Sequence, residues 1–300
     1  MNAYMRALRA PFLAGSITPI LIGGGYAILQ SSFDGPRFLL CLLGVGALHL
    51  GANLINDYYD ARGSDPINWR LTPFSGGSRV IQDGTVPSRA VLAMAIGFFG
   101  LGLICGIALA FTGRPLVLII GALGFGAGWS YSASPVQLMA RGFGEIVIFF
   151  AFGPLITLGT SYALCGALSL DAFLIGIPHG FLIAEVIWIN QFPDYEADRT
   201  AGKRNLVVRW GLERARRIYV SIILLSFVSL ALLAMLAEIP FSILAGLLAL
   251  PFGVKASTVL WREYRSHEGV VPAQAGTIQT LIVQGVLVTL GLIAGRFFSG

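Results

Sequence analysis

Apolar runs of about 20 residues recur along the whole chain, and this feature limits its fold more than any other. A helix needs about 20 consecutive apolar residues to cross the hydrocarbon core of a bilayer. Hydrophobic residues make up 56% of the 300 positions and charged residues only 12%, whereas about a quarter of the residues in a soluble domain are charged. A soluble helical protein would also need polar stripes at helical spacing, which most of these runs lack. The sequence therefore predicts a multi-pass α-helical membrane protein.

About nine segments are predicted to cross the membrane, and together they form one intramembrane domain over residues 1–300. Their approximate bounds are 10–30, 38–59, 89–112, 115–134, 143–164, 170–192, 217–237, 239–260 and 275–297. Two polar segments, 61–88 and 194–216, are predicted to be loops that cap the bundle. The first crossing segment is too long for the apolar region of a secretion signal, so we expect it to remain uncleaved.

Basic residues gather on one side of this predicted topology. With nine crossings, the N-terminus and the loops after the even-numbered segments share a side, and only Arg37, Arg114 and Arg296 fall opposite. Because cytoplasmic loops carry an excess of Lys and Arg, the crowded side is predicted to be cytoplasmic and the C-terminus to lie on the other side. The net charge of +5 fits this topology and contact with anionic membrane lipid, and we expect no nucleic-acid partner.

Polar and acidic residues share one helix face where the second crossing segment ends. His49, Asn53, Asn56, Asp57 and Asp60 follow helical spacing, so their side chains point to the same side. A solvated helix end would explain this segment if it stood alone. The sequence contains a second segment of the same kind, which makes that explanation weaker.

The second acidic segment ends the sixth crossing segment. Asn190, Asp194 and Asp198 are spaced i, i+4, i+8. Asn56 aligns with Asn190 and Asp60 with Asp194, and both segments run into basic loops at the same predicted membrane depth. We therefore expect the two segments to face each other across a shared cavity.

Carboxylates gathered near one membrane surface need a positive partner. Two like charges 4 Å apart repel by about 4 kcal/mol at an effective dielectric constant of about 20. Aspartates with neighbouring amide oxygens suit Mg²⁺, which commonly completes its coordination with water and phosphate oxygens. The predicted metal ligands are Asn56, Asp57, Asp60, Asp65, Asp194 and Asp198. A diphosphate between the two segments would be contacted by Arg62, Arg70, Arg79, Lys203 and Arg204.

Three stretches make the sequence resemble the UbiA superfamily of intramembrane prenyltransferases. They cover residues 53–65, 131–145 and 190–211. The second and third, with residues 152–155, look most like the branch that prenylates 1,4-dihydroxy-2-naphthoate in menaquinone biosynthesis. The resemblance implies nine helices around a central cavity that opens to the cytoplasm and laterally to lipid. It also implies a prokaryotic inner-membrane enzyme that uses Mg²⁺ to transfer a polyprenyl group from an allylic diphosphate to an aromatic acceptor.

The resemblance and the chemistry of individual side chains together suggest roles for particular residues. Catalysis is expected to depend on Asn56, Asp60, Asp194, Asp198 and Tyr131, whose ring is our first choice to stabilise an allylic cation. His49 and Glu185 are ionisable residues inside crossing segments, where such residues are costly, and each is either functional or a neutral, buried group. The expected substrate-binding residues are Asn53, Asp57, Asn190, Arg62, Arg70, Arg79, Arg141, Lys203, Arg204, His49 and Glu185.

Two alternative functions remain open at this point. A prenyltransferase of the same type could use another acceptor, such as 4-hydroxybenzoate, homogentisate or another quinone or lipid precursor. A cation transporter would also place carboxylates inside a membrane protein. The acidic residues gather at one face without a second polar layer on the other, which argues against transport. The expected partners are polyprenyl diphosphate, an aromatic acceptor and membrane lipid.

Overall fold

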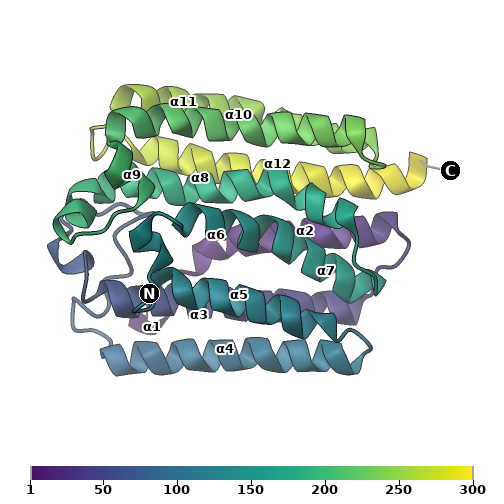
Figure 1. The fold of residues 1–300 in the computed structure, drawn as a ribbon, viewed down its shortest axis with the longest axis horizontal. Helices are drawn as coiled ribbons and strands as arrows, with labels where there is room; N and C mark the ends of the chain where they lie inside the picture. The colour runs from purple at the N-terminus through teal and green to yellow at the C-terminus, as the bar shows by residue number, and fades with distance from the viewer. Residues whose placement is uncertain (1, 299–300) are drawn as a thin grey trace.

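The computed structural model describes residues 2–298, and all regular secondary structure in that range is helical. Figure 1 shows the long helices lying side by side in one bundle. The N-terminal elements are α1 (Ala3–Ala7), η1 (Ala10–Leu13), α2 (Ala14–Leu29), α3 (Gly35–Asp60), η2 (Asp65–Ile67), α4 (Ser88–Phe111) and α5 (Leu116–Ser132). The middle of the chain forms η3 (Leu138–Arg141), α6 (Gly144–Phe150), η4 (Ala151–Leu155), α7 (Ile156–Cys165) and α8 (Leu170–Thr200). The remaining elements are α9 (Leu206–Trp210), α10 (Leu212–Leu236), η5 (Phe241–Ala249), α11 (Leu250–Glu263) and α12 (Val271–Phe298).

The number of membrane crossings agrees with the sequence. In the described chain, eight helical segments are long and apolar enough to cross a membrane, and α5 is a shorter apolar helix of 17 residues. Three of the eight segments are built from consecutive helical pieces, namely 3–29, 144–165 and 241–263. The predicted all-α, multi-pass fold with about nine crossings is confirmed.

Helix starts follow the usual capping chemistry. The Asp34 side chain accepts a hydrogen bond from the backbone N–H of Arg37 at the start of α3, and Pro36 occupies the first turn. The Ser169 side chain likewise accepts from the backbone N–H of Ala172 at the start of α8. These contacts satisfy backbone donors that no helical carbonyl can reach.

Both bounds of the predicted cap loop, 194 and 216, are wrong. Helix α8 runs to Thr200 and α10 already begins at Leu212. The apolar run ends near residue 192, but the helix continues because Ala197 and Asp198 in its last turns are also buried. In the structure, therefore, only two short connections, one on either side of α9, are not helical. Gly211, with φ of 74°, turns the chain between α9 and α10.

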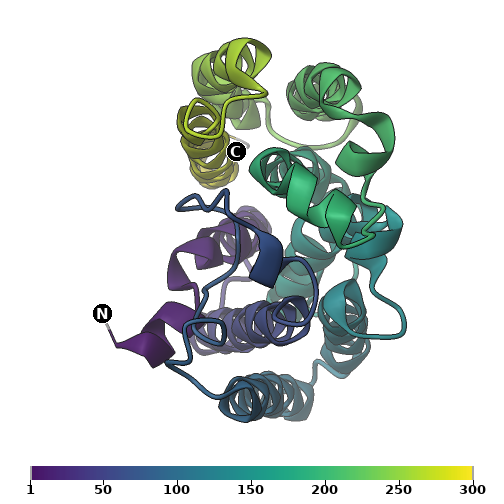
Figure 2. The ribbon, with the colours of Figure 1, turned by 90° about the vertical axis from the view of Figure 1, so that its left-hand side faces the viewer.

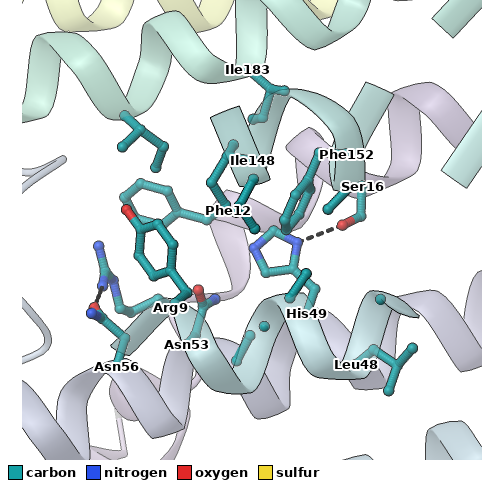
Figure 3. A pocket seen from close by; sticks show the side chains of 18 of the residues that line it. Arg9, Phe12, Ser16, Leu48, His49, Asn53, Asn56, Ile148, Phe152 and Ile183 are labelled. Atoms are coloured by element: carbon teal, nitrogen blue, oxygen red, sulfur yellow. Dashed lines mark hydrogen bonds between the residues drawn. The ribbon is translucent and has the colours of Figure 1, made fainter. Parts of the chain in front are cut away.

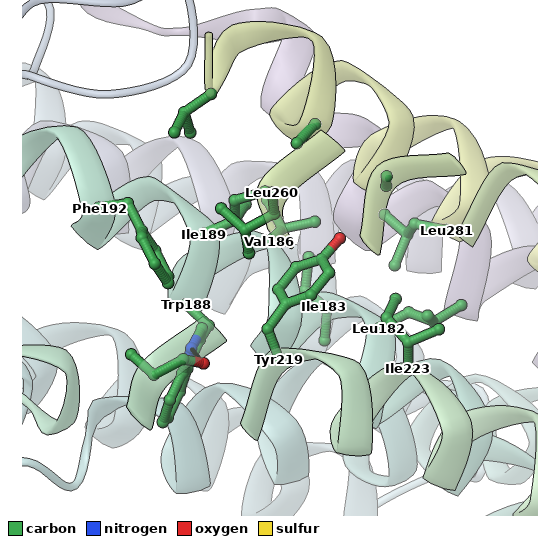
Figure 4. Packing of buried hydrophobic residues seen from close by; sticks show 14 of the residues in the cluster. Leu182, Ile183, Val186, Trp188, Ile189, Phe192, Tyr219, Ile223, Leu260 and Leu281 are labelled. Carbon is green, nitrogen blue, oxygen red and sulfur yellow. Dashed lines mark hydrogen bonds between the residues drawn. The ribbon is translucent and has the colours of Figure 1, made fainter. Parts of the chain in front are cut away.

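A buried apolar cluster attaches α8 to the C-terminal helices (Figure 4). Trp188 and Ile189 from α8 pack with Tyr219 from α10, Leu260 from α11 and Leu281 from α12. The indole N–H of Trp188 donates to the carbonyl oxygen of Ala215 at 3.1 Å, which satisfies a polar group inside this cluster. This packing fixes α8, the helix that carries the second acidic segment.

The π-helix η4 packs very closely on α8. A Cβ atom on Gly176 of α8 would lie 2.6 Å from the Cα atom of Pro154 in η4, and one on Gly153 would meet the backbone of Gly180. Glycine is therefore required at this crossing. Seen from the end of the bundle that carries the long loops, residues 61–87 lie across the helix ends (Figure 2), where both acidic segments stop.

Candidate active site

A cavity of about 300 Å³ lies inside the bundle. Its polar end is lined by Arg9, Asn53, Asn56, Asp60, Asp65, Asn68, Asn190, Gln191, Asp194, Asp198, Lys203 and Asn205. The remaining wall is mostly apolar, and most of it comes from α3, α4, α5, α6, η4, α7 and α8. Figure 3 shows part of this wall, with Arg9 near Asn56 and with His49 beside Phe152. The cavity thus joins a charged end to a long apolar part.

Lys203 connects the two acidic segments. Its Nζ lies 3.1 Å from Oδ1 of Asp60 at the end of α3 and 3.4 Å from Oδ1 of Asp198 on α8. A second connection comes from the loop after α3, where Asn68 Nδ2 donates to Oδ1 of Asp194 at 2.7 Å. The aligned segments therefore meet at the same end of one cavity.

Asn56 is held by four neighbours, one of which is Met139, whose sulfur atom lies 3.5 Å from Asn56 Nδ2. Its Nδ2 donates to Oδ2 of Asp60 at 3.0 Å and to Oγ of Ser132 at 2.9 Å. Its Oδ1 accepts a 3.4 Å hydrogen bond from Arg9. These contacts orient Asp60 toward the cavity and connect α3 with α5.

Asp57 was predicted to be a metal ligand, but its side chain lies behind the cavity wall. It is 3% exposed, accepts from the backbone N–H of Ser78 at 3.3 Å, and lies 3.7 Å from Arg9. The adjacent positions Asn56 and Asp57 point in different directions because successive helix residues are rotated by about 100°. Asp57 thus anchors Arg9 and the loop rather than facing the cavity.

The loop residues Asp65 and Lys203 carry shifted pKa values. Burial raises the pKa of Asp65 to about 7, and the charges of Asp60 and Asp57 contribute to this rise. Burial lowers the pKa of Lys203, but the Asp60 and Asp198 carboxylates outweigh burial and raise it above its ordinary value. Burial is the main cause of the Asp65 shift, whereas the excess of negative charge in the site accounts for the Lys203 shift.

The donor set fits Mg²⁺ shared with a phosphate ligand. Four carboxylates line the cavity, and the basic residues lining it in the described structure are Arg9 and Lys203. Within residues 2–298, no three His, Cys, Asp or Glu side chains converge closely enough to hold a metal ion by themselves. Mg²⁺ is usually bound by one or two carboxylates together with water and substrate phosphates, so the oxygen donors present match that mode.

Five arginines that were predicted to bind substrate lie outside the cavity wall. They are Arg62, Arg70, Arg79, Arg141 and Arg204. Arg62 lies over the Tyr58 ring at 4.3 Å, Arg79 donates to the backbone carbonyl of Asp65, and Arg141 donates to the carbonyl of Pro135 at 2.7 Å. Sequence proximity to the acidic segments suggested contact with the ligand, but in the structure these three side chains hold loops.

Glu185 also lies away from the cavity. Ile183 and Ile187 line the wall, and Glu185, two residues from each, is on the opposite face of α8. Its side chain is fully buried, and neither carboxyl oxygen has a hydrogen-bond partner among the described residues. The prediction that Glu185 binds substrate does not agree with this placement.

Several predicted residues do line the cavity. His49 Nδ1 lies 2.6 Å from Oγ of Ser16, and its ring meets the Phe152 ring edge-on at 5.0 Å (Figure 3). Tyr131 reaches the wall from α5, and Asn53 from α3. Asn190, also on the wall, accepts a hydrogen bond from Gln274 Nε2 at 2.9 Å.

Sequence reasoning missed Arg9, Asn68 and Asn205. In the sequence Arg9 is only a topology signal, yet in the structure it contacts both Asn56 and Asp57. Asn205 caps α9 and also donates to Oδ2 of Asp198 at 2.8 Å. A capping asparagine can be found from sequence, but its contact with another helix cannot.

A helical membrane bundle with two matched acidic segments at one end of a largely apolar cavity has the architecture of an intramembrane prenyltransferase. Residues 16–271 match the UbiA prenyltransferase family, and the chain belongs to this family. The resemblance seen in the sequence is thereby confirmed, and the protein is a prenyltransferase. The family assignment favours the enzyme over the cation transporter.

Similar proteins support the same assignment over the whole chain. A 1,4-dihydroxy-2-naphthoate octaprenyltransferase of Escherichia coli is 30% identical over 302 residues, covering 99% of this chain and 96% of the relative. One from Mycobacterium tuberculosis is 29% identical over 294 residues, covering 98% and 97%. The structure of a UbiA homolog from Archaeoglobus fulgidus bound to GPP and Mg²⁺ matches with a TM-score of 0.69 at 18% identity, covering 95% and 99% of the two chains, which shows a shared fold.

Proposed function

We propose that this enzyme transfers a polyprenyl group from an allylic diphosphate to 1,4-dihydroxy-2-naphthoate in menaquinone biosynthesis, with Mg²⁺ as cofactor. The observation that carries this proposal is the contact of Lys203 with both Asp60 and Asp198 at the charged end of an apolar cavity. A diphosphate with a long apolar tail needs both environments in one site. The two bacterial relatives named above support the choice of acceptor.

Lys203 and Arg9 are assigned to the diphosphate, because cationic side chains form charge-assisted hydrogen bonds with phosphate oxygens. Asp60, Asp194 and Asp198 would hold Mg²⁺, which when bound stabilises negative charge on the leaving diphosphate. The asparagines beside these aspartates orient their carboxylates. The apolar wall keeps water from the allylic carbon.

The reaction breaks the bond between the allylic carbon and the diphosphate oxygen. The face of the Tyr131 ring is assigned to stabilise the resulting allylic cation, since aromatic faces attract positive charge. A ring carbon of the acceptor then forms the new bond to the allylic carbon. The ring becomes aromatic again when that carbon loses its substituent, which is a proton or, at the carboxylated carbon, CO₂.

The proposed location is the inner membrane of a prokaryote, with the N-terminus and the charged end of the cavity at the cytoplasmic side. The concentration of basic residues at that end supports this orientation. Polyprenyl diphosphate and acceptor would then enter from the cytoplasmic leaflet, while the C-terminus lies on the opposite side.

The test is a transfer assay with purified protein, labelled farnesyl diphosphate, Mg²⁺ and a panel of aromatic acceptors, with products identified by mass. We expect a prenylated product from 1,4-dihydroxy-2-naphthoate and loss of activity with EDTA that excess Mg²⁺ restores. Asp60→Ala and Asp194→Ala should each abolish transfer, while Asp83→Ala, an exposed acid paired with Arg6, should retain it. Product from hydroxybenzoate or homogentisate alone would replace the proposed acceptor, and activity in both cavity variants would refute the assigned site.

A further inference from the structure

Gln191 presents a buried hydrogen-bond acceptor that no residue in the range 2–298 uses. It lies on the cavity wall, three residues before Asp194 on α8. Its Nε2 donates to Oε1 of Glu145 at 2.7 Å. Its Oε1 is buried and has no hydrogen-bond partner within the described part of the chain. A buried, unpaired carbonyl oxygen is costly, so a ligand that donates a hydrogen bond is the expected partner.

Glu145 fixes which way the Gln191 amide points. Glu145 is 6% exposed and sits in the first turn of α6, outside the cavity wall. The hydrogen bond from Gln191 Nε2 to Oε1 of Glu145 places the NH₂ group toward Glu145, and the amide oxygen is left for the other side.

The chemistry of the two substrates decides which of them can meet this oxygen. A diphosphate bound to Mg²⁺ offers only acceptor oxygens, and a polyprenyl tail offers no polar hydrogen. A hydroxyl group on the aromatic acceptor is a donor. Gln191 lies about 4.5 Å deeper along α8 than Asp194, between the residues assigned to the diphosphate and the apolar wall formed by Val186 and Ile187.

We propose that Gln191 binds a hydroxyl group of the aromatic acceptor through its amide oxygen, and that Glu145 is the positioning residue that holds this amide in the productive orientation. The inference rests on the proposed prenyl transfer to an aromatic acceptor. It assigns the acceptor end of the cavity to a residue pair from α8 and α6, separate from the acidic segments that hold the diphosphate.

Gln191→Met removes the amide with little change in volume. We expect the KM for 1,4-dihydroxy-2-naphthoate to rise about tenfold, while the KM for farnesyl diphosphate and the Mg²⁺ dependence stay within about twofold. Gln279→Met, an exposed glutamine on α12, is the matched control and should change none of these values. Thermal unfolding of each variant, measured in the same detergent, reports whether the fold is retained.

Methyl ethers of the acceptor separate a hydrogen bond from a general packing effect. For the wild type, methylation of one of the two hydroxyls should raise KM about tenfold. For Gln191→Met, the same methylation should have no further effect, because the hydrogen bond is already lost. Glu145→Gln should give an intermediate KM, since a neutral amide at this position no longer dictates the orientation of Gln191.

The two hypotheses fail in distinguishable ways. If the wild type prenylates only another hydroxyaromatic compound, the proposed acceptor is wrong, and the comparison is made with that compound and its methyl ether. If the wild type is active but Gln191→Met leaves the acceptor KM unchanged, or remains as sensitive to methylation as the wild type, the amide oxygen binds only water and the inference is overturned.

Discussion

At the scale of single residues, Lys203 balances the charge of both acidic segments. Its side chain is 11% exposed and contacts Asp60 and Asp198. Removing one partner of a buried ion pair leaves uncompensated charge and costs roughly 3 kcal/mol or more. Lys203→Met should therefore lower the melting temperature of the metal-free protein and reduce kcat by at least about 100-fold, a loss of the size expected when a group that stabilises transition-state charge is removed.

Arg204→Met is the matched control for this variant. Arg204 is the next residue, and its side chain lies outside the cavity wall. It should retain nearly full activity and stability in the same calorimetric and transfer assays. Equal losses in both variants would mean that the basic loop acts through its overall charge and not through the Lys203 contacts.

The raised pKa of Asp65 predicts how the stability of the metal-free protein depends on pH. Burial and the charges of Asp60 and Asp57 raise its pKa from 3.8 to about 7, against the opposing charges of Lys203 and Arg9. A raised folded-state pKa contributes stability that is complete below about pH 4 and is lost as the pH rises through about 7. This contribution makes metal-free protein more stable at about pH 5 than at about pH 8, and stabilisation by Mg²⁺ should increase over the same range.

Asp65→Asn isolates the contribution of this residue. The amide cannot ionise, so the difference in melting temperature between wild type and variant should change between about pH 5 and about pH 8 in EDTA. A difference that stays constant over this range would show that Asp65 does not titrate there.

At the scale of helices, the crossing of η4 and α8 depends on glycine. A Cβ atom on Gly176 would overlap the backbone of Pro154, which cannot move without shifting the π-helix that carries Phe152. Gly176→Ala should destabilise the protein by about 2 kcal/mol or more and raise KM for both substrates. Gly97→Ala on α4, where no atom lies within 4 Å, should be neutral or stabilising. Urea unfolding in micelles measures both effects, and equal stabilities would contradict a crossing this close.

Helix existence could be predicted from the apolar runs, whereas some helix ends could not. The end of α8 shows why. Its last turns are polar in sequence, but Asp198 is buried against Lys203 and Asn205. Hydropathy records the solvent preference of a side chain and contains no information about partners from other segments. The same limit explains why the short helix α9 was not predicted within the loop 194–216.

At the scale of the whole molecule, the two ends of the bundle differ in charge and in the segments they expose. Figure 1 shows the α8–α9 connection and the α7–α8 connection at opposite ends of the bundle. If the charged end is cytoplasmic, Ala201→Cys should react with an impermeant thiol reagent only after the inner membrane is opened. Leu168→Cys, 57% exposed in the wild type, should react in intact spheroplasts.

The labelling is carried out in a background without the native residues Cys41, Cys105 and Cys165. Transfer activity of each variant confirms that it is folded. The reverse pattern of labelling would invert the proposed orientation, and labelling of both positions from one side would contradict an odd number of crossings between them.

The membrane-spanning class, the approximate number of crossings and the pairing of the two acidic segments follow from the order of the residues, because hydropathy and helical spacing are local properties. Which polar residues share the cavity depends on the packing of the helices. It placed Arg9, Asn68 and Gln191 on the wall and moved Glu185 and five arginines away from it. The physical reason is that a side chain's direction follows from how its helix is rotated and packed against others, and that rotation is set by contacts between segments far apart in the chain.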